Sequence, residues 1–260
     1  MADLQDQQMN TLVGHMTELR RRLVYSILAF IILSLISYQY AREIYSFLVK
    51  PLAEIFKGED RRLIYTGLTE AFITYIKLAL FAGGFLSFPI VASQIWMFVA
   101  PGLYRNEKKV FLPFLIATPV LFLCGAAFVY CFVIPVAWKF FAGFEMFASQ
   151  NNGLPIQLEA RVGEYLSLTM TLIFSFGICF QLPVILVLLS KIGLISHATL
   201  VRKRRYAILI IFIVAAVLTP PDILSQFMLA IPLLALYEIS VMLVRFTEKK
   251  HRPAAEITVE

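Results

Sequence analysis

Long apolar runs, each close to the length needed to cross a lipid bilayer, recur along this chain and constrain its fold more than any other feature. An α-helix needs about 20 mostly apolar residues to cross the hydrocarbon core. We predict six such runs, at residues 23–40, 71–99, 110–135, 165–190, 206–218 and 225–244. Because backbone groups in lipid must find their partners within the spanning structure, each run is expected to be helical. The sequence therefore predicts an all-α, polytopic membrane protein.

The composition excludes an ordinary soluble domain. Only 15% of the 260 residues are charged and 60% are hydrophobic, whereas a soluble domain carries roughly 25% charged residues. The cysteines Cys124, Cys131 and Cys179 lie inside apolar runs, so we interpret them as small buried hydrophobic residues. We expect a single integral membrane domain over residues 1–260, with a flexible tail at residues 246–260.

The predicted spans differ in length and in their flanking residues. The first, 23–40, follows three arginines as in a signal peptide, but it is long for one and lacks a cleavage pattern after it, so we expect a retained helix. The second, 71–99, contains Pro89, where tilting or a kink is expected. The fifth, 206–218, rises only about 20 Å as a helix, which indicates a locally thin bilayer or protein surroundings.

The distribution of positive charge predicts the orientation of these spans. Six spans place both termini on one side, and that side carries fifteen Lys and Arg residues against seven on the other, with Lys77 inside the second span. Cytoplasmic loops carry the excess of Lys and Arg, so both termini are predicted to be cytoplasmic. The net charge of +6 therefore describes topology, and we expect the lipid bilayer as a partner and no nucleic acid.

No catalytic motif stands out. The sequence lacks a His-Glu-x-x-His zinc motif, a Gly-x-Ser-x-Gly elbow and a P-loop. The histidines His15, His197 and His251 fall outside the predicted spans, and Glu238 is the one clear acidic residue within them. We therefore expect no enzyme activity, no metal and no cofactor. A small-solute secondary transporter is the alternative, but it needs polar groups converging at the bilayer midplane, and these are scarce.

Two carboxylates, Glu18 and Glu107, lie among cations at the predicted cytoplasmic edge. In one interpretation each simply pairs with its neighbours, and a Glu18–Arg22 pair at i,i+4 on a helix contributes roughly 0.2–0.5 kcal/mol. In the other, each accepts a guanidinium group from a ligand, because Arg forms bidentate bonds to carboxylate that Lys cannot copy. The residues alone leave both interpretations open.

Polar residues within the apolar runs are the second set of candidates, because they are costly in lipid and often mark function. Gln181 lies beside Pro183, while Thr219 and Gln226 flank a Pro-Pro-Asp turn that ends at Asp222. These side chains either form hydrogen bonds between helices, worth about 0.6 kcal/mol on average, or dock a partner. Asp222 is interpreted as a turn or N-cap residue of the sixth span.

Several segments together carry a resemblance to a known family, TatC, the multi-spanning receptor subunit of the twin-arginine protein translocase. The similar segments are HMTELRRRL at 15–23, KPL at 50–52, QIWMFVAPGLY at 94–104 followed by Glu107, FQLP at 180–183, LTPPDILSQ at 218–226 and AIP at 230–232. They follow the order of the family and cover nearly the whole chain.

The resemblance implies a function that hydrophobic periodicity does not reveal. Members of the family bind the Arg-Arg pair of signal peptides on folded cargo at the cytoplasmic face of the bacterial inner membrane. The resemblance implies that Glu18 and Glu107 accept these arginines and that Arg20 shapes the site. It also implies a concave, cupped bundle of six helices and transport driven by the proton-motive force.

The resemblance further implies partners and structural residues. Single-span TatA-type and TatB-type subunits are expected at the fifth helix, where Thr219 and Gln226 match polar contact positions, and other copies of the chain are expected in the receptor complex. Pro51 and Asp222 match structural positions of the external loops. Many members carry Glu where this chain has Gln181, so we expect Gln181 to contact a partner or signal helix and not to transfer protons.

Overall fold

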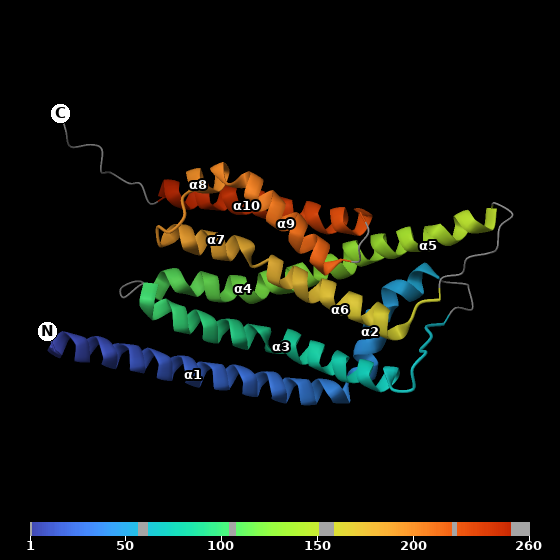
Figure 1. Cartoon of the computed structure of the whole chain (residues 1–260), viewed down its shortest axis with the longest axis horizontal. Helices are drawn as coiled ribbons and strands as arrows, with labels where there is room; N and C mark the ends of the chain where they lie inside the picture. The colour runs from blue at the N-terminus through green and yellow to red at the C-terminus, as the bar shows by residue number, and fades with distance from the viewer. Residues whose placement is uncertain (1, 57–61, 104–107, 151–158, 220–222, 251–260) are drawn as a thin grey trace. The chain divides into compact units, whose positions relative to one another are not determined.

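A computed structural model describes residues 2–56, 62–103, 108–150, 159–219 and 223–250 of the chain. The described residues are helical apart from short connections and one isolated bridge, so the all-α prediction is confirmed. Figure 1 shows the elements in chain order: α1 (Ala2–Gln39), α2 (Ala41–Ile55), α3 (Glu70–Leu103), α4 (Lys108–Phe128), the π-helix η1 (Val129–Val133), α5 (Ile134–Gln150), α6 (Val162–Cys179), α7 (Leu182–Lys191), α8 (His197–Arg202), α9 (Arg204–Leu218) and α10 (Ile223–Lys250).

Four stretches of the described residues are long and apolar enough to cross a membrane: Glu70–Phe98, Pro113–Gly143, Val162–Lys191 and Gln226–Glu248. A fifth is counted if α1 and α2, which are bent by 79° at Tyr40, form one broken span. The chain is therefore a multi-spanning helical protein. Helix α9 occupies the position of the predicted short fifth span, but its 15 residues rise only about 22 Å.

Some elements differ from the sequence prediction. Helix α1 begins at Ala2, so the arginine cluster lies on a helix and not in a tail. Residues 41–55, predicted as part of a polar stretch, form helix α2, whose buried side chains include Leu48 and Leu52 at helical spacing. Helix α5 continues to Gln150 through the expected loop.

The predicted fourth span is divided in two. Helix α6 ends at Cys179 and α7 begins at Leu182, whereas α3 continues through Pro89 as one helix. The break arises because Pro183 has no N–H to donate to the carbonyl of Cys179 one turn earlier. Pro183 then occupies the first turn of α7, where a missing N–H costs little.

The contacts of the chain divide it into two units, which are described separately. The first unit comprises Met1–Ser46 and Phe72–Pro119. In it, α1 and α3 approach closely where small residues meet, because a Cβ added at Gly83 would lie 2.5 Å from the Cα of Ser34. Such close approach through small residues is how helices pack in lipid, where no hydrophobic force drives them together.

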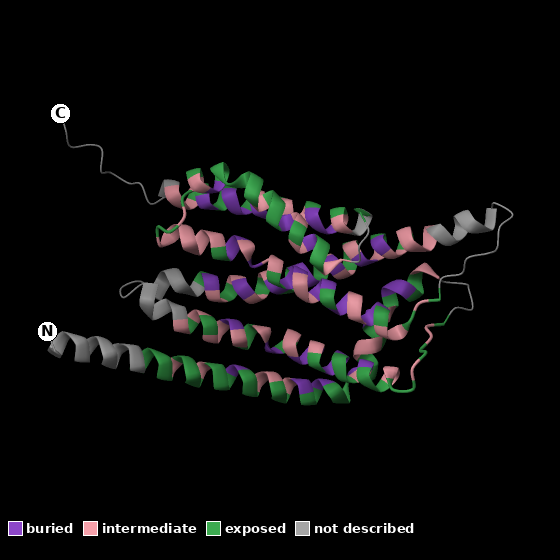
Figure 2. Ribbon diagram, viewed as in Figure 1, coloured by how far each residue is buried: buried purple, intermediate pink, exposed green. Residues whose placement is uncertain are grey.

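The second unit comprises Phe47–Ala71 and Val120–Glu260. Helix α10 packs against α7, α8 and α9, and Figure 2 shows buried positions recurring along it. The buried residues of α10 include Leu229, Leu233 and Val241. Helices α4 and α6 meet at two glycines, with Gly125 against the carbonyl of Phe176 and Gly177 against the Phe122 ring. Glycine at these positions lets the two backbones come close.

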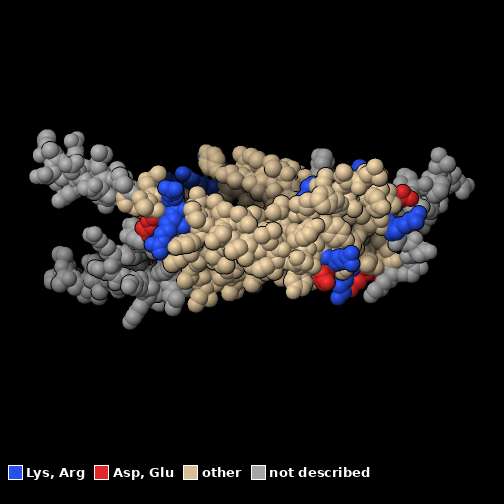
Figure 3. Space-filling model, turned by 90° about the horizontal axis from the view of Figure 1, so that it is seen from below, with Lys and Arg blue, Asp and Glu red and all other residues tan. Residues whose placement is uncertain are grey.

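The exposed surface is rich in large apolar side chains, as expected for helices that face lipid. Leu35, Val217 and Ile231 are all more than half exposed. Figure 3 shows that the charged side chains on the face in view lie in a few groups with uncharged surface between them, and that red and blue lie together in the larger groups. Near the C-terminal end of α10, the Glu248 carboxylate accepts a 2.7 Å hydrogen bond from the His197 amide at the start of α8. The first residues of the segment predicted to be flexible are therefore helical.

Candidate functional site

The Glu18 carboxylate lies on α1 and pairs with Arg22 one turn later. The Nε and Nη2 atoms of Arg22 lie 3.1 and 2.5 Å from the same carboxylate oxygen, Oε1. The side chain of Glu18 is 39% exposed and that of Arg22 is 20% exposed. The i,i+4 pair considered from the sequence is therefore present, and the carboxylate remains accessible from solvent.

The face of α1 that carries Glu18 lies beside the last turns of α3. His15, one turn before Glu18, stacks on Phe98 of α3 with the ring centroids 4.2 Å apart and the planes at 21°. Arg20 is exposed and, being two positions from Glu18, points to another side of the helix. The structure thus brings His15, Glu18 and Arg22 to one face and does not bring Arg20 to the carboxylate.

Glu107, the second predicted acceptor, lies outside the described residues, as does Asp222. The helices on either side of Glu107 are held together by a hydrogen bond that sequence reasoning missed. The Trp96 Nε1 atom of α3 donates to the Thr118 hydroxyl of α4 at 2.8 Å, and that hydroxyl donates to the Phe114 carbonyl. The indole within the segment QIWMF was the available signal, but its partner was not predictable.

Gln181 lies in the break between α6 and α7 and is buried, with 7% of its surface exposed. Its amide Nε2 donates to the Gly177 carbonyl at 3.4 Å, within the last turn of α6. The neutral amide of Gln181 is compatible with this burial.

Thr219 and Gln226 both bond to backbone carbonyls of α9. The Thr219 hydroxyl donates to Ala215 at 2.9 Å, and Gln226 Nε2 donates to Phe212 at 3.1 Å. The Gln226 bond connects the start of α10 to α9, which is the interhelical role considered from the sequence. Glu238 of α10 likewise pairs with Arg204 at 2.7 Å, so the acidic residue found in a predicted span has a cationic partner.

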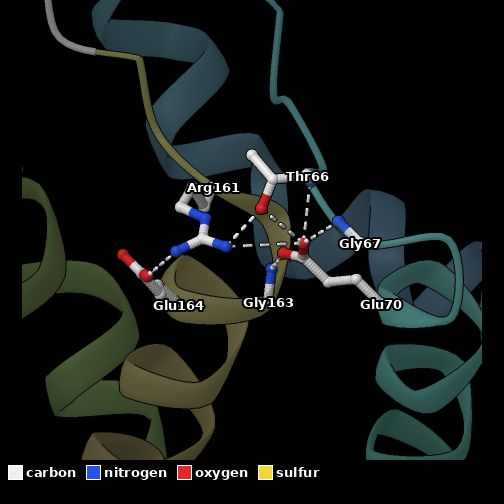
Figure 4. Close-up of polar contacts among 6 residues, drawn as sticks. All are labelled: Thr66, Gly67, Glu70, Arg161, Gly163 and Glu164. Carbon is white, nitrogen blue, oxygen red and sulfur yellow. Dashed lines mark hydrogen bonds and ion pairs between the residues drawn. The ribbon is translucent and has the colours of Figure 1, made fainter.

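A polar cluster before α3 and α6 was not predicted from the sequence. We call it the Glu70–Arg161 cluster; its members are Thr66, Gly67, Glu70, Arg161, Gly163 and Glu164 (Figure 4). Glu70, the first residue of α3, accepts hydrogen bonds from the amides of Thr66 at 2.9 Å, Gly67 at 3.3 Å and Gly163 at 3.2 Å. One carboxylate therefore holds the turn that precedes α3 and accepts a free amide at the N-terminus of α6.

Arg161 completes the cluster. Its Nη1 atom lies 2.8 Å from Glu164, its Nη2 atom lies 3.9 Å from Glu70, and Nη2 also donates to the Thr66 hydroxyl. A parallel bridge joins Ile64 to Arg161 through the bonds Ile64 N to Ala160 O and Val162 N to Ile64 O. The segments before α3 and before α6, predicted to lie on the same side of the membrane, are therefore joined directly.

Pro51, predicted to have a structural role in a loop, lies inside helix α2 and is buried. Two tyrosine hydroxyls donate to carbonyls of this helix in the turn before the proline. Tyr130 of η1 donates to Phe47 at 2.7 Å and Tyr165 of α6 donates to Leu48 at 2.8 Å. These two bonds join the part of α2 that belongs to the second unit to η1 and α6.

The second unit also contains a cavity of about 850 Å³. Its lining is mainly apolar and includes Leu52, Trp138, Tyr165, Leu168, Leu218 and Thr219. Arg161 and Glu164 of the Glu70–Arg161 cluster also line it. Among the described residues, no group of three or more His, Cys, Asp or Glu side chains is arranged to hold a metal ion.

Known proteins resemble this chain over most of its length. The family described as Sec-independent protein translocase protein (TatC) matches residues 14–232. The Sec-independent protein translocase protein TatC of Rickettsia prowazekii is 49% identical over 234 residues, 90% of this chain and 92% of that protein. That of Magnetococcus marinus is 47% identical over 248 residues, 95% of this chain and 89% of that protein. A crystal structure of the twin-arginine translocase receptor TatC has a TM-score of 0.79 at 35% identity, covering 90% of this chain and 99% of that one.

Proposed function

Because this chain belongs to the TatC family of Sec-independent protein translocase proteins, we propose that it binds the Arg-Arg pair of signal peptides at the cytoplasmic face of a bacterial inner membrane. Family membership makes it a non-enzymatic, multi-pass subunit of the Tat protein translocase. Membership in this family excludes the alternative of a small-solute transporter. What is proposed beyond membership is the ligand, the residues that bind it, the orientation and the partners.

The observation that carries the proposal is the exposure and the hydrogen bonding of the Glu18 carboxylate. It is partly exposed and already binds a guanidinium group, that of Arg22, through two N–H groups. A carboxylate at a helix surface that accepts one guanidinium can accept another from a ligand, and arginine matches carboxylate in a way that lysine does not. Glu107 is proposed as the second acceptor on the resemblance alone.

A six-span topology with cytoplasmic termini supports this placement of Glu18. The excess of Lys and Arg on the terminal side favours it. The bridge between the segments before α3 and α6 agrees with this topology, in which both segments lie on one side of the membrane. In this proposal α9 is the short fifth crossing, the spans form the cupped bundle of the family, and the chain is one integral membrane domain.

The proposed partners are single-span TatA-type and TatB-type subunits at α9. Ile210, Ile213 and Val217 of α9 are exposed and fall at i, i+3 and i+7, so they form one apolar stripe along the helix. Thr219 and Gln226 are proposed as polar contacts at its external end, and Gln181 as a contact for a partner or signal helix. Other copies of the chain are proposed as further members of the complex. Export by this complex is proposed to be driven by the proton-motive force.

The test is binding of a synthetic twin-arginine signal peptide to the full chain in lipid vesicles. We expect Glu18→Ala and Glu107→Ala each to raise the Kd about tenfold or more, since hydrogen bonds to charged groups contribute about 1.5–3 kcal/mol. A Lys-Lys peptide is expected to bind poorly. Glu54→Ala, on α2, removes a carboxylate from the opposite side and should bind like wild type. Wild-type binding by both Glu variants, together with equal binding of the two peptides, would contradict the assignment.

A further inference from the structure

We propose that Arg202, Lys203 and Arg205 form a binding site for the phosphate groups of anionic phospholipids beside the start of α9. The three residues lie at the end of α8 and the start of α9, and all three are exposed. This inference rests on the proposed topology, in which α9 crosses the membrane and begins on the cytoplasmic side. It does not depend on the proposed binding of signal peptides.

The basic segment, residues 202–205, carries more positive charge than the described carboxylates neutralise. Its residues are Arg202, Lys203, Arg204 and Arg205. Arg204 pairs with Glu238 of α10 at 2.7 Å, whereas none of the other three forms an ion pair with a carboxylate of the described residues. Arg205 donates instead to the neutral Tyr206 hydroxyl at 3.1 Å. Three neighbouring cations are therefore open to an anion from outside the chain.

The basic segment contacts α10 well before the end of that helix. Helices α8 and α9 pack against α10, as Figure 1 shows. The Tyr237 hydroxyl of α10 donates to the Leu200 carbonyl of α8 at 2.9 Å, and the next residue of α10, Glu238, holds Arg204. Glu238 lies ten positions before Glu248, a distance of about 15 Å along a helix. The segment therefore meets α10 inside its apolar span and not at its C-terminal end.

The length of α9 brings the same cations to the level of lipid headgroups. Its 15 residues rise only about 22 Å, whereas the hydrocarbon core of a bilayer is about 30 Å thick. Unpaired charges in hydrocarbon are costly, so a crossing by α9 requires polar groups of the lipid to reach its first turn. Arg205 lies 4.9 Å from the centre of the Tyr206 ring, and tyrosine is typical of the headgroup level. Headgroups are therefore expected to meet α9 at its basic end.

The charge of the segment selects a phospholipid with a net negative charge, such as phosphatidylglycerol. A guanidinium presents planar donors that match phosphate oxygens in pairs, and an ammonium binds phosphate as a point charge. A zwitterionic lipid also carries a phosphate, but its own ammonium group is repelled by the same three cations. Each Lys or Arg close to an anionic membrane surface contributes about fivefold in affinity. Three of them together therefore favour the anionic lipid strongly.

The experiment measures the Kd of single lipids for the full chain in detergent by native mass spectrometry. The probes are phosphatidylglycerol and phosphatidylcholine with identical acyl chains. The test variant combines Arg202→Gln, Lys203→Gln and Arg205→Gln. We expect wild type to prefer phosphatidylglycerol, and the ratio of the two Kd values to fall by about tenfold or more in the test variant. No preference in wild type, or an unchanged ratio in the test variant, would overturn the inference.

Two control variants separate the site from net charge and from misfolding. The first removes three exposed cations that are far apart in the sequence, through Arg42→Gln, Lys50→Gln and Lys139→Gln, and should keep the wild-type ratio. The second, Arg202→Lys with Arg205→Lys, keeps the charge and should keep most of the preference, since lysine also binds phosphate. A fall in either control as large as that in the test variant would overturn the inference, because net charge or altered structure would then explain it.

Two further measurements separate a lipid site from a site for free phosphate esters and from an error in the topology. Glycerophosphoglycerol, the soluble headgroup, should not displace phosphatidylglycerol, and displacement would overturn the assignment to lipid. A spin label at Ile210, which is 59% exposed, tests the crossing of α9 in vesicles after the three native cysteines are replaced by alanine. Oxygen should reach this label and a water-soluble relaxation agent should not. If the label is in lipid and the lipid preference is absent, this inference fails alone; if the label is in water, the proposed topology fails and this inference fails with it.

Discussion

The Tyr130 hydroxyl donates a 2.7 Å hydrogen bond to the carbonyl of Phe47, the residue four positions before Pro51 in helix α2. In an uninterrupted helix the amide of residue 51 would bond to that carbonyl, but proline has no N–H. The rings of Phe47 and Tyr130 also stack, with centroids 4.5 Å apart. A side chain from η1 therefore supplies the donor that the proline removes.

Tyr130→Phe is expected to lower the free energy of unfolding by about 0.5–1.5 kcal/mol, because it removes the hydrogen bond to the Phe47 carbonyl. Pro51→Ala restores an amide at residue 51, so the double variant should recover most of that loss. Denaturant titration in detergent micelles, followed by circular dichroism, measures this cycle. Tyr65→Phe, in an exposed segment, is the control. Losses that add within about 0.5 kcal/mol would show that the two residues act independently.

Glu70→Ala is expected to destabilise the second unit more than Glu164→Ala does, because it removes the acceptor of three backbone amides. Glu164→Ala breaks only a pair with Arg161 in which the glutamate side chain is 71% exposed, and should cost less than about 1 kcal/mol. Hydrogen exchange at the Gly163 amide gives a local readout, and it should accelerate in Glu70→Ala alone. Unchanged exchange there would show that the carboxylate does not cap α6.

Gly125→Ala is expected to destabilise the packing of α4 on α6 by about 1–3 kcal/mol. The added Cβ would lie 2.7 Å from the carbonyl oxygen of Phe176, a backbone atom that cannot rotate away. Gly143→Ala is the matched control, since nothing lies within 4 Å of its Cβ position, and alanine there should stabilise the helix slightly. Thermal unfolding in detergent compares the two, and equal midpoints would contradict the close approach.

The exposed stripe of α9 is expected to contact the proposed single-span partner. Cysteine introduced at Ile213 or Val217 should form a crosslink with a cysteine in the partner's span, because both side chains are more than half exposed. Cysteine at Leu229, which is 1% exposed on α10, should not react. A functional complex without any crosslink along α9 would place the partner elsewhere.

The fold was predictable where hydrophobicity alone decides it. The long apolar runs predicted α3, α6 with α7, and α10 closely, because a spanning helix depends mainly on its own composition. Helix α2 was missed, since its charged residues and Pro51 made it read as a polar connection. Two of its carbonyls accept hydrogen bonds from Tyr130 and Tyr165, which lie 83 and 117 residues away in the chain, so its local sequence does not reveal these partners.

The candidate sites were also predictable only where residues close together in the sequence determine the contact. The Glu18–Arg22 pair was one of two interpretations open from the sequence, because helical spacing places i and i+4 side by side. The Glu70–Arg161 cluster was not, because nothing near Glu70 in the sequence indicates that Gly163 and Arg161 will meet it. Gln226 was singled out as a polar residue in an apolar region, but its acceptor, the Phe212 carbonyl, is a backbone atom that no residue type identifies.

The bridge between Ile64 and Arg161 also sets an order of events during synthesis. The Thr66 hydroxyl receives its bond from an arginine 95 residues later in the chain, and Glu70 accepts from an amide 93 residues later. The segment before α3 leaves the ribosome long before these donors exist. It can complete its hydrogen bonding only after α3, α4 and α5 have been made and the start of α6 has followed them. The final shape of this early segment is therefore settled late in biogenesis.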